Sequence, residues 1–108
     1  MKNQKKWEKK ENKDAKDFGG KRVKASGSLW YLPGDVKTDQ FLIDSKHTEK
    51  KSYSLTLKTW NKLYDEALFT FRIPILSPQI QDTELVVLDK DDFLKILSLV
   101  NLDDLKIT

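Results

Sequence analysis

Two aspartates and a lysine near the middle of the chain have the types and spacing needed to hydrolyse a phosphodiester bond. Asp44 and Lys46 lie two residues apart in a segment, 40–46, that predicts a β-strand, so their side chains point to one face. Asp35 lies in the adjoining strand of the same predicted hairpin. Two carboxylates can hold a divalent cation that polarises a phosphate and activates water, while a lysine stabilises the developing negative charge. These residues predict a metal-dependent phosphodiesterase.

The turn of this hairpin decides whether the two carboxylates meet. A loop of two or four residues around Thr38-Asp39 pairs Asp35 with Leu42 and makes Asp35 a diagonal neighbour of Asp44. Their Cα atoms are then about 7–8 Å apart, close enough for both side chains to reach one cation. A loop of odd length would turn Asp35 to the other face and separate the pair.

A further carboxylate, Glu11, lies on the apolar face of a predicted helix over 7–18. Gly19-Gly20 ends this helix, because glycine accepts the left-handed conformation found at helix ends. The apolar residues on the face of Glu11 are Trp7, Ala15 and Phe18. The other acids fall off that face and are expected to pair with neighbouring lysines: Glu8, Asp14 and Asp17. Glu11 could add a metal ligand or act as the base for water.

The elements around these residues predict a small mixed α/β domain, with a central sheet flanked by helices. Helical periodicity is most regular over 57–71. Pro74 places its strand at a sheet edge or at a strand start. The remaining predicted elements are strands at 21–25, 35–37, 73–76 and 84–88, and a helix that begins near Asp89 and continues to Val100. The chain is expected to be one domain over 1–108, with residues 1–6 as a frayed basic tail.

Composition removes several kinds of chemistry. The chain has 108 residues, no cysteine and one histidine, which excludes thiol catalysis and thiolate zinc sites. A bound metal should therefore be a hard ion held by carboxylates, such as Mg²⁺ or Mn²⁺. No apolar run approaches the ~20 residues that span a bilayer, so we expect a soluble, cytoplasmic protein without membrane contact.

Charge is distributed unevenly along the chain and favours a polyanionic partner. The net charge is +6 over residues 1–24, +1 over 25–72 and −4 over 73–108. A basic end is typical of nucleic-acid binding, although it also occurs as a solubilising tail. Five basic residues are candidates to follow DNA phosphates, with plain solvated surface as the alternative for each: Arg22, Lys24, Lys37, Lys50 and Lys51.

Gly34-Asp35 followed by Asp44-Ser45-Lys46, within an αβββαβ order, resembles the PD-(D/E)xK nuclease superfamily, and within it the small Holliday junction resolvases of archaea and phages. The resemblance implies an Mg²⁺-dependent endonuclease, in which Mn²⁺ can substitute, acting as a homodimer on branched DNA. It implies Glu11, Asp35, Asp44 and Lys46 as catalytic residues, the three acids as metal ligands, and DNA contacts from Ser26 and Ser28. Asp44 departs from the more common glutamate, which shortens the reach to the metal.

Two other functions fit the same residues. A nuclease with this core could act on nicked, flapped or single-stranded DNA, and a non-catalytic DNA-binding module could retain a decayed nuclease core. His47 should point away from the face of Lys46 and be structural or exposed. Trp30 and Tyr31 could stack on DNA bases or pack in a core or dimer interface. The apolar residues expected to contact a second copy, or to cap the chain's own sheet, are Leu99, Leu102 and Leu105.

Overall fold

The sheet is built around two long parallel strands, β3 (Phe41–Thr48) and β4 (Ile73–Ile80). The computed structural model describes residues 6–23 and 35–106, and in this part the strand order is β1-β2-β3-β4-β5, with β6 also paired to β4. The other strands are short: β1 (Lys21–Arg22), β2 (Asp35–Lys37), β5 (Thr83–Glu84) and β6 (Val87–Leu88). All pairs other than β3–β4 are antiparallel. In these two ranges, three α-helices and a six-stranded mixed sheet confirm the predicted α/β class.

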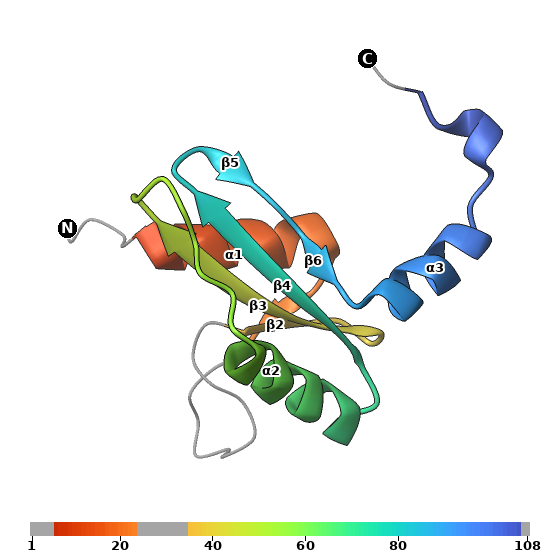
Figure 1. The fold of residues 1–108 in the computed structure, drawn as a ribbon, viewed down its shortest axis with the longest axis horizontal. Helices are drawn as coiled ribbons and strands as arrows, with labels where there is room; N and C mark the ends of the chain where they lie inside the picture. Colours follow the sequence, from red (N-terminus) through yellow and green to blue (C-terminus); the bar gives the residue numbers. More distant parts are fainter. Residues whose placement is uncertain (1–5, 24–34, 107–108) are drawn as a thin grey trace.

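The two longer helices, α1 (Lys6–Phe18) and α2 (Leu57–Phe69), cover opposite faces of the sheet (Figure 1). Alternation along the strands gives each face its own apolar core. The core under α2 consists of Leu42, Leu63, Ala67 and Leu76, with Tyr53, Trp60 and Val87 packed against it. The core under α1 consists of Val36, Ile43 and Ile75, with Ala15, Phe18, Phe41 and Leu88 packed against it.

This alternation sets the direction of every polar side chain on β3. Leu42 is fully buried under α2, so Asp44 and Lys46 emerge on the α2 face of the sheet. Ile43 is fully buried under α1, so Ser45 and His47 emerge on the α1 face. The predicted separation of His47 from Lys46 is therefore confirmed, and the buried apolar residues of the strand determine which face each polar side chain occupies.

Two prolines lie in the interior strand β4 without interrupting its pairing with β3. The N–H of Ile73 donates to the carbonyl of Gln40 and that of Gln81 to Thr48, both at 2.8 Å. The odd-numbered residues of β4 thus direct their N–H groups toward β3. Pro74 and Pro78 are even-numbered, so the N–H groups that they lack would have pointed away from β3. Pro74 is the second residue of the strand, as its predicted position at a strand start requires.

The end of α1 follows the predicted glycine pair. Gly19 has φ +68°, and the N–H of Gly20 donates to the carbonyl of Ala15 at 2.8 Å. A Cβ on Gly20 would lie 2.5 Å from the carbonyl oxygen of Lys37, so no other residue fits there without a shift of β2. The first glycine ends the helix, and the second lets the chain pass close to the β2–β3 hairpin.

The C-terminal part differs in detail from its prediction. The single strand expected at 84–88 is two short strands, β5 and β6, with Leu85 and Val86 between them. Asp89 caps α3 (Lys90–Ser98) as predicted, but the helix ends before Val100 and a short 3₁₀ helix, η1 (Leu102–Asp104), follows. α3 has no buried residue and extends away from the sheet (Figure 1). None of the helices in the described ranges has the length and apolar content needed to cross a membrane.

Candidate metal and phosphate site

Asp35 and Asp44 are direct partners across the β2–β3 pair. The predicted register was wrong by two residues, since Asp35 lies opposite Asp44 and Leu42 lies opposite Lys37. Thr38 closes the turn, because its side-chain hydroxyl accepts hydrogen bonds from the N–H groups of Gln40 and Phe41. The predicted sharing of one face holds, and the Cβ atoms of direct partners are only about 4.5–5.5 Å apart. The two carboxylates are therefore closer than the diagonal arrangement would have placed them.

These aspartates lie in a pocket of about 420 Å³ between the sheet and α2. Lys46 lines the same pocket from β3, so three of the predicted catalytic residues come together. α2 supplies the opposite wall with residues from successive turns: Lys58, Thr59, Lys62, Leu63 and Glu66. The pocket is thus acidic where the strands form it and largely basic where the helix does.

Asp35 is the most deeply buried polar group in this pocket, with 3% of the residue exposed. Its Oδ2 atom has no hydrogen-bond partner among the described residues. Burial, followed by the charges of Asp44 and Glu66, raises the pKa of Asp35 to about 8, against the smaller opposing effect of Lys46. Without a cation, this carboxyl therefore holds its proton at neutral pH.

Asp44 is stabilised by a lysine on its own strand. The Nζ atom of Lys46 lies 3.4 Å from Asp44 Oδ1, and 15% of the Asp44 side chain is exposed against 42% of that of Lys46. Burial raises the pKa of Asp44, while Lys46 and then Lys62 oppose that change. Asp44 therefore has a cationic partner that Asp35 lacks.

This donor set fits a hard divalent cation. Mg²⁺ and Mn²⁺ take carboxylate oxygens as ligands, and two carboxylates on one face could share such an ion. The unpartnered Oδ2 of Asp35 is a buried acceptor with no hydrogen bond to lose when an ion binds. The arrangement can therefore hold a cation at the base of the pocket and leave the Lys46 ammonium free to reach an anion at its mouth.

No family model, curated protein or solved structure matches this chain. What the fold supports is a small mixed α/β domain with a mixed sheet and clustered acidic residues.

Glu11 lies on α1, across the sheet from this pocket, and does not line it. The residue is 2% exposed, and Arg22 Nε donates to its Oε1 at 3.0 Å. Burial raises the pKa of Glu11, with Arg22 opposing and Asp44 adding a small repulsion. Glu11 therefore interacts electrostatically with Asp44 through the sheet, but its direct hydrogen-bond partner is Arg22.

The residues expected to bind DNA are dispersed around the domain. Arg22 binds Glu11 and Asn12, and Lys37 lies on β2 beside a separate pocket at the end of α1. Lys50 and Lys51 are exposed beyond the end of β3. None of these four lines the Asp35–Asp44 pocket. The remaining predicted residues lie outside the described ranges: Lys24, Ser26, Ser28, Trp30 and Tyr31.

Sequence reasoning missed the α2 wall of the pocket. Lys58, Lys62 and Glu66 recur at i, i+4 and i+8, which places them on one side of the helix next to buried Leu63 and Ala67. This polar stripe could be found in the sequence, but nothing there shows which edge of α2 lies over Asp44. The crossing of α2 over the sheet decides that.

A second acidic group lies on the α1 face. Asp14, Asp17 and Glu84 could hold a metal ion, since each offers an oxygen within 4.8 Å of the others. Two lysines already occupy this group. Lys10 Nζ lies 2.8 Å from Asp14 and 3.3 Å from Glu84, and Lys13 Nζ lies 3.0 Å from Asp17 and 2.6 Å from Glu84. The hydrogen bond from Lys13 lowers the pKa of Glu84, as expected for an ion-paired carboxylate.

Asp14 also corrects the expectation that it lies off the buried face of α1. It is 2% exposed and accepts hydrogen bonds from Lys10, from Ser45 at 2.5 Å and from Ser77 at 3.4 Å. Lys10 donates to Ser77 as well, at 2.9 Å. The predicted pairing with a lysine is present, but as a buried polar network that joins α1 to β3 and β4.

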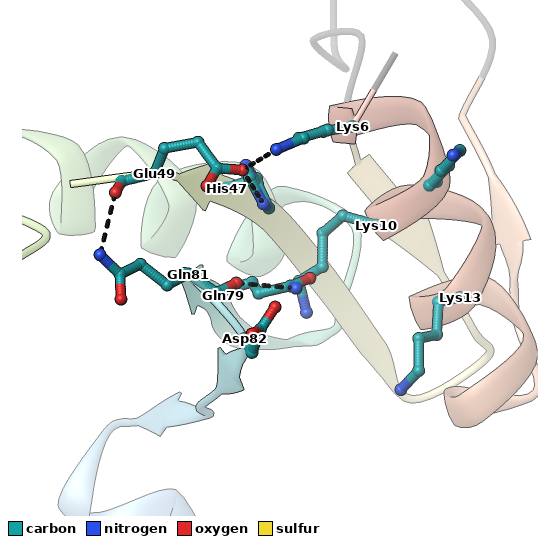
Figure 2. Close-up of a pocket in the computed structure, with 9 residues that line it drawn as sticks. Lys6, Lys10, Lys13, His47, Glu49, Gln79, Gln81 and Asp82 are labelled. Atoms are coloured by element: carbon teal, nitrogen blue, oxygen red, sulfur yellow. Dashed lines mark hydrogen bonds and ion pairs between the residues drawn. The ribbon is translucent and has the colours of Figure 1, made fainter. Parts of the chain in front are cut away.

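His47 belongs to a pocket on the α1 side, at the ends of β3 and β4 (Figure 2). Its Nε2 atom lies 3.4 Å from Glu49 Oε1, and Lys6 binds the same carboxylate. Gln81 donates to the carbonyl of Glu49 at 3.2 Å. Figure 2 shows these groups turned toward one another. At this end of the pocket, the polar side chains are therefore occupied by contacts that connect α1, the end of β3 and the end of β4.

Proposed function

We propose that the protein is a metal-dependent DNA endonuclease that hydrolyses phosphodiester bonds at the Asp35–Asp44 pocket. The observation that carries this proposal is the buried Asp35 carboxyl, which has one oxygen without a partner among the described residues and faces the half-buried carboxylate of Asp44. Burial disfavours the ionised form of both carboxyls, Lys46 offsets this cost only in part, and a cation between the two carboxylates would remove the rest. Mg²⁺ is the expected ion, with Mn²⁺ as a substitute.

Each residue of the pocket has a distinct role in this proposal. Asp35 and Asp44 would hold the cation, which supplies Lewis-acid polarisation of the phosphate and a more acidic bound water. Lys46 stabilises the negative charge that develops on the phosphate oxygens, because its ammonium is partly exposed beside Asp44. Lys58 and Lys62 bind neighbouring phosphates and fix the DNA backbone across the mouth of the pocket.

The order of elements supports a nuclease of the PD-(D/E)xK type. The chain runs α1-β1-β2-β3-α2-β4, with the first aspartate at the start of β2 and the Asp-x-Lys sequence on β3, parallel to β4. This is the αβββαβ order that the motif implies. The preference for branched DNA depends on the further similarity to small resolvases, whereas a nuclease acting on nicked, flapped or single-stranded DNA would use the same pocket.

A homodimer would suit cleavage of a four-way junction, because a two-fold pair presents two sites to two strands. The α3–η1 segment offers an apolar surface for such contact. Its exposed apolar side chains are Phe93, Leu94, Leu99, Val100, Leu102 and Leu105. The α3–η1 segment extends away from the sheet (Figure 1) and contributes no residue to the lining of the Asp35–Asp44 pocket.

Cleavage of end-labelled four-way junction, duplex and single-stranded DNA in Mg²⁺ tests the proposal. We expect paired cuts in the junction, lost in Asp44→Ala and Lys46→Ala and retained in Lys95→Ala, a change on the exposed surface of α3. Cutting of every substrate would keep the chemistry and refute the junction preference. DNA binding without cutting in either Mg²⁺ or Mn²⁺ would refute the nuclease and favour a binding module.

A further inference from the structure

The pocket holds a third carboxylate that the sequence motif does not include. Glu66 lies on the last part of α2 and lines the pocket together with Asp35 and Asp44. Its neighbours on the helix, Leu63 and Ala67, are buried at 3% and 0% exposure in the core under α2. The packing of these two residues fixes that side of α2 against the sheet, so the place of Glu66 over the strands is determined by the fold.

The partners of Glu66 and Glu11 differ. Glu11 is bound by Arg22 on the α1 face, at 3.0 Å. The Glu66 carboxylate makes no hydrogen bond or ion pair in the described part of the chain, and it is half-buried at the edge of the pocket. A carboxylate that is already satisfied by an arginine is a poor third ligand, whereas one without a partner on the pocket wall is free to bind a cation.

A second observation points independently to a ligand here. Asp35 lines this pocket, is 97% buried, and has an oxygen without a hydrogen-bond partner among the described residues. Buried acceptors of this kind are rare in folded proteins and usually mark an ion, a water or a functional role. The three carboxylates thus line one pocket, in which at least one carboxylate oxygen is buried and has no partner among the described residues.

We propose that Glu66 supplies the third carboxylate of the cation site formed by Asp35 and Asp44, in the role that the sequence suggests for Glu11. This inference depends on the proposed metal-dependent function. The site would then draw its ligands from β2, β3 and α2, all on one face of the sheet.

Titration of the metal-free protein with Mn²⁺, followed by electron paramagnetic resonance and calorimetry, tests the assignment without relying on activity. We expect Glu66→Gln to weaken Mn²⁺ binding by about 10-fold or more, as loss of a metal-supporting group typically does. Asp44→Asn should abolish saturable binding. Asp65→Asn, an exposed acid on the adjacent position of α2, and Glu11→Gln should bind Mn²⁺ as the wild type does.

The outcomes separate this inference from the proposed function. If Asp44→Asn abolishes Mn²⁺ binding and Glu66→Gln leaves it unchanged, the assignment of Glu66 is wrong and the metal site stands. If Glu11→Gln weakens binding instead, the third ligand is Glu11. If Asp44→Asn binds Mn²⁺ normally, the metal site itself fails. Circular dichroism of each variant shows whether it is folded, and Glu66→Asp, which keeps the charge, should recover part of the affinity if Glu66→Gln folds poorly.

Discussion

Asp35 and Asp44 face each other directly across the β2–β3 pair, on the face of the sheet that α2 covers. Only Asp44 has a lysine beside it, and the inner oxygen of Asp35 has no partner among the described residues. The metal-free fold can relieve the repulsion by protonating Asp35, while a divalent cation would relieve it without a proton. The free energy of unfolding should therefore differ measurably between the metal-free and the cation-bound protein.

Mg²⁺ should stabilise the wild-type protein but not Asp35→Asn. A ligand that binds only the folded state adds about 2.7 kcal/mol at 100 times its dissociation constant. Without metal, and at a pH above the raised pKa of Asp35, the variant should be more stable than the wild type because it lacks the buried charge. Urea unfolding in EDTA and in Mg²⁺ measures both effects.

Asp39→Asn is the matched control for this measurement, because it removes an exposed acid from the turn of the same hairpin. It should respond to Mg²⁺ as the wild type does. Equal stabilisation of the wild type and Asp35→Asn by Mg²⁺ would place the bound ion elsewhere.

The stability of the metal-free protein should fall as the pH rises from about 4 toward 8. The pKa of Asp35 is raised from 3.8 to about 8, so the folded state keeps a proton that the unfolded chain has lost in this window. The contribution is fully present below the unfolded pKa and is lost as the pH passes the folded one, at up to about 1.4 kcal/mol per pH unit. Unfolding in urea at several pH values, with EDTA, gives the slope.

Asp35→Asn should flatten this profile, although the raised pKa values of Asp44 and Glu66 leave a smaller slope of the same sign. A wild-type profile that is flat between pH 4 and 8 would contradict the burial of an unpaired Asp35. Addition of Mg²⁺ should also reduce the slope, because a bound cation favours the ionised carboxylate.

Local patterns could predict the hairpin and the face on which its polar side chains lie. Alternation along 40–46 determines that Asp44 and Lys46 share a face, and Leu42 identifies the buried side of the strand. The register could not be fixed in the same way, because it depends on how the turn is closed. Thr38 closes it with two side-chain hydrogen bonds, and so pairs Asp35 with Asp44.

Contacts between elements far apart in the sequence could not be predicted. Glu66 reaches the pocket only because Leu63 and Ala67 pack on Leu42 and Leu76. Asp14 was expected on the surface because it falls outside the apolar stripe of its helix, yet it is buried and hydrogen-bonded to Ser45 on β3 and Ser77 on β4. In both cases tertiary packing selects the buried side of an amphipathic helix.

Lys46→Ala should lower the rate of DNA cleavage by about 10²–10³-fold in single-turnover experiments, the usual effect of removing one group that stabilises a developing charge. Mn²⁺ binding should persist or become tighter, because the change removes a positive charge 3.4 Å from Asp44. Lys95→Ala provides a matched control. Wild-type cleavage by Lys46→Ala would show that the lysine does not act on the phosphate.

Leu99→Asp combined with Leu105→Asp should convert a dimer into monomers. Leu99 is 86% exposed and Leu105 73% exposed, so the charges disturb no described core. Light scattering with size-exclusion chromatography gives the mass, circular dichroism shows that the fold is kept, and Lys90→Ala serves as the control. A wild-type protein that is monomeric at micromolar concentration, or a double variant that stays dimeric, would exclude pairing through α3.

Asp14→Ala should destabilise the protein strongly, because it leaves the Lys10 ammonium buried beside fewer acceptors. The side chains of Lys10 and Asp14 are 1% and 3% exposed, and breaking such a pair typically costs about 3–5 kcal/mol. Asp17→Ala, which removes a half-exposed acid of the same group, should change the stability little. Urea unfolding of both variants measures the difference.

Replacing both partners separates the structural role of this pair from metal binding. Lys10→Met with Asp14→Leu should recover much of the stability lost in Asp14→Ala, because no buried charge then lacks a partner. Mg²⁺ should stabilise the double variant as much as the wild type if the ion binds at Asp35 and Asp44. Loss of the Mg²⁺ effect in the folded double variant would instead assign the ion to the group of Asp14, Asp17 and Glu84.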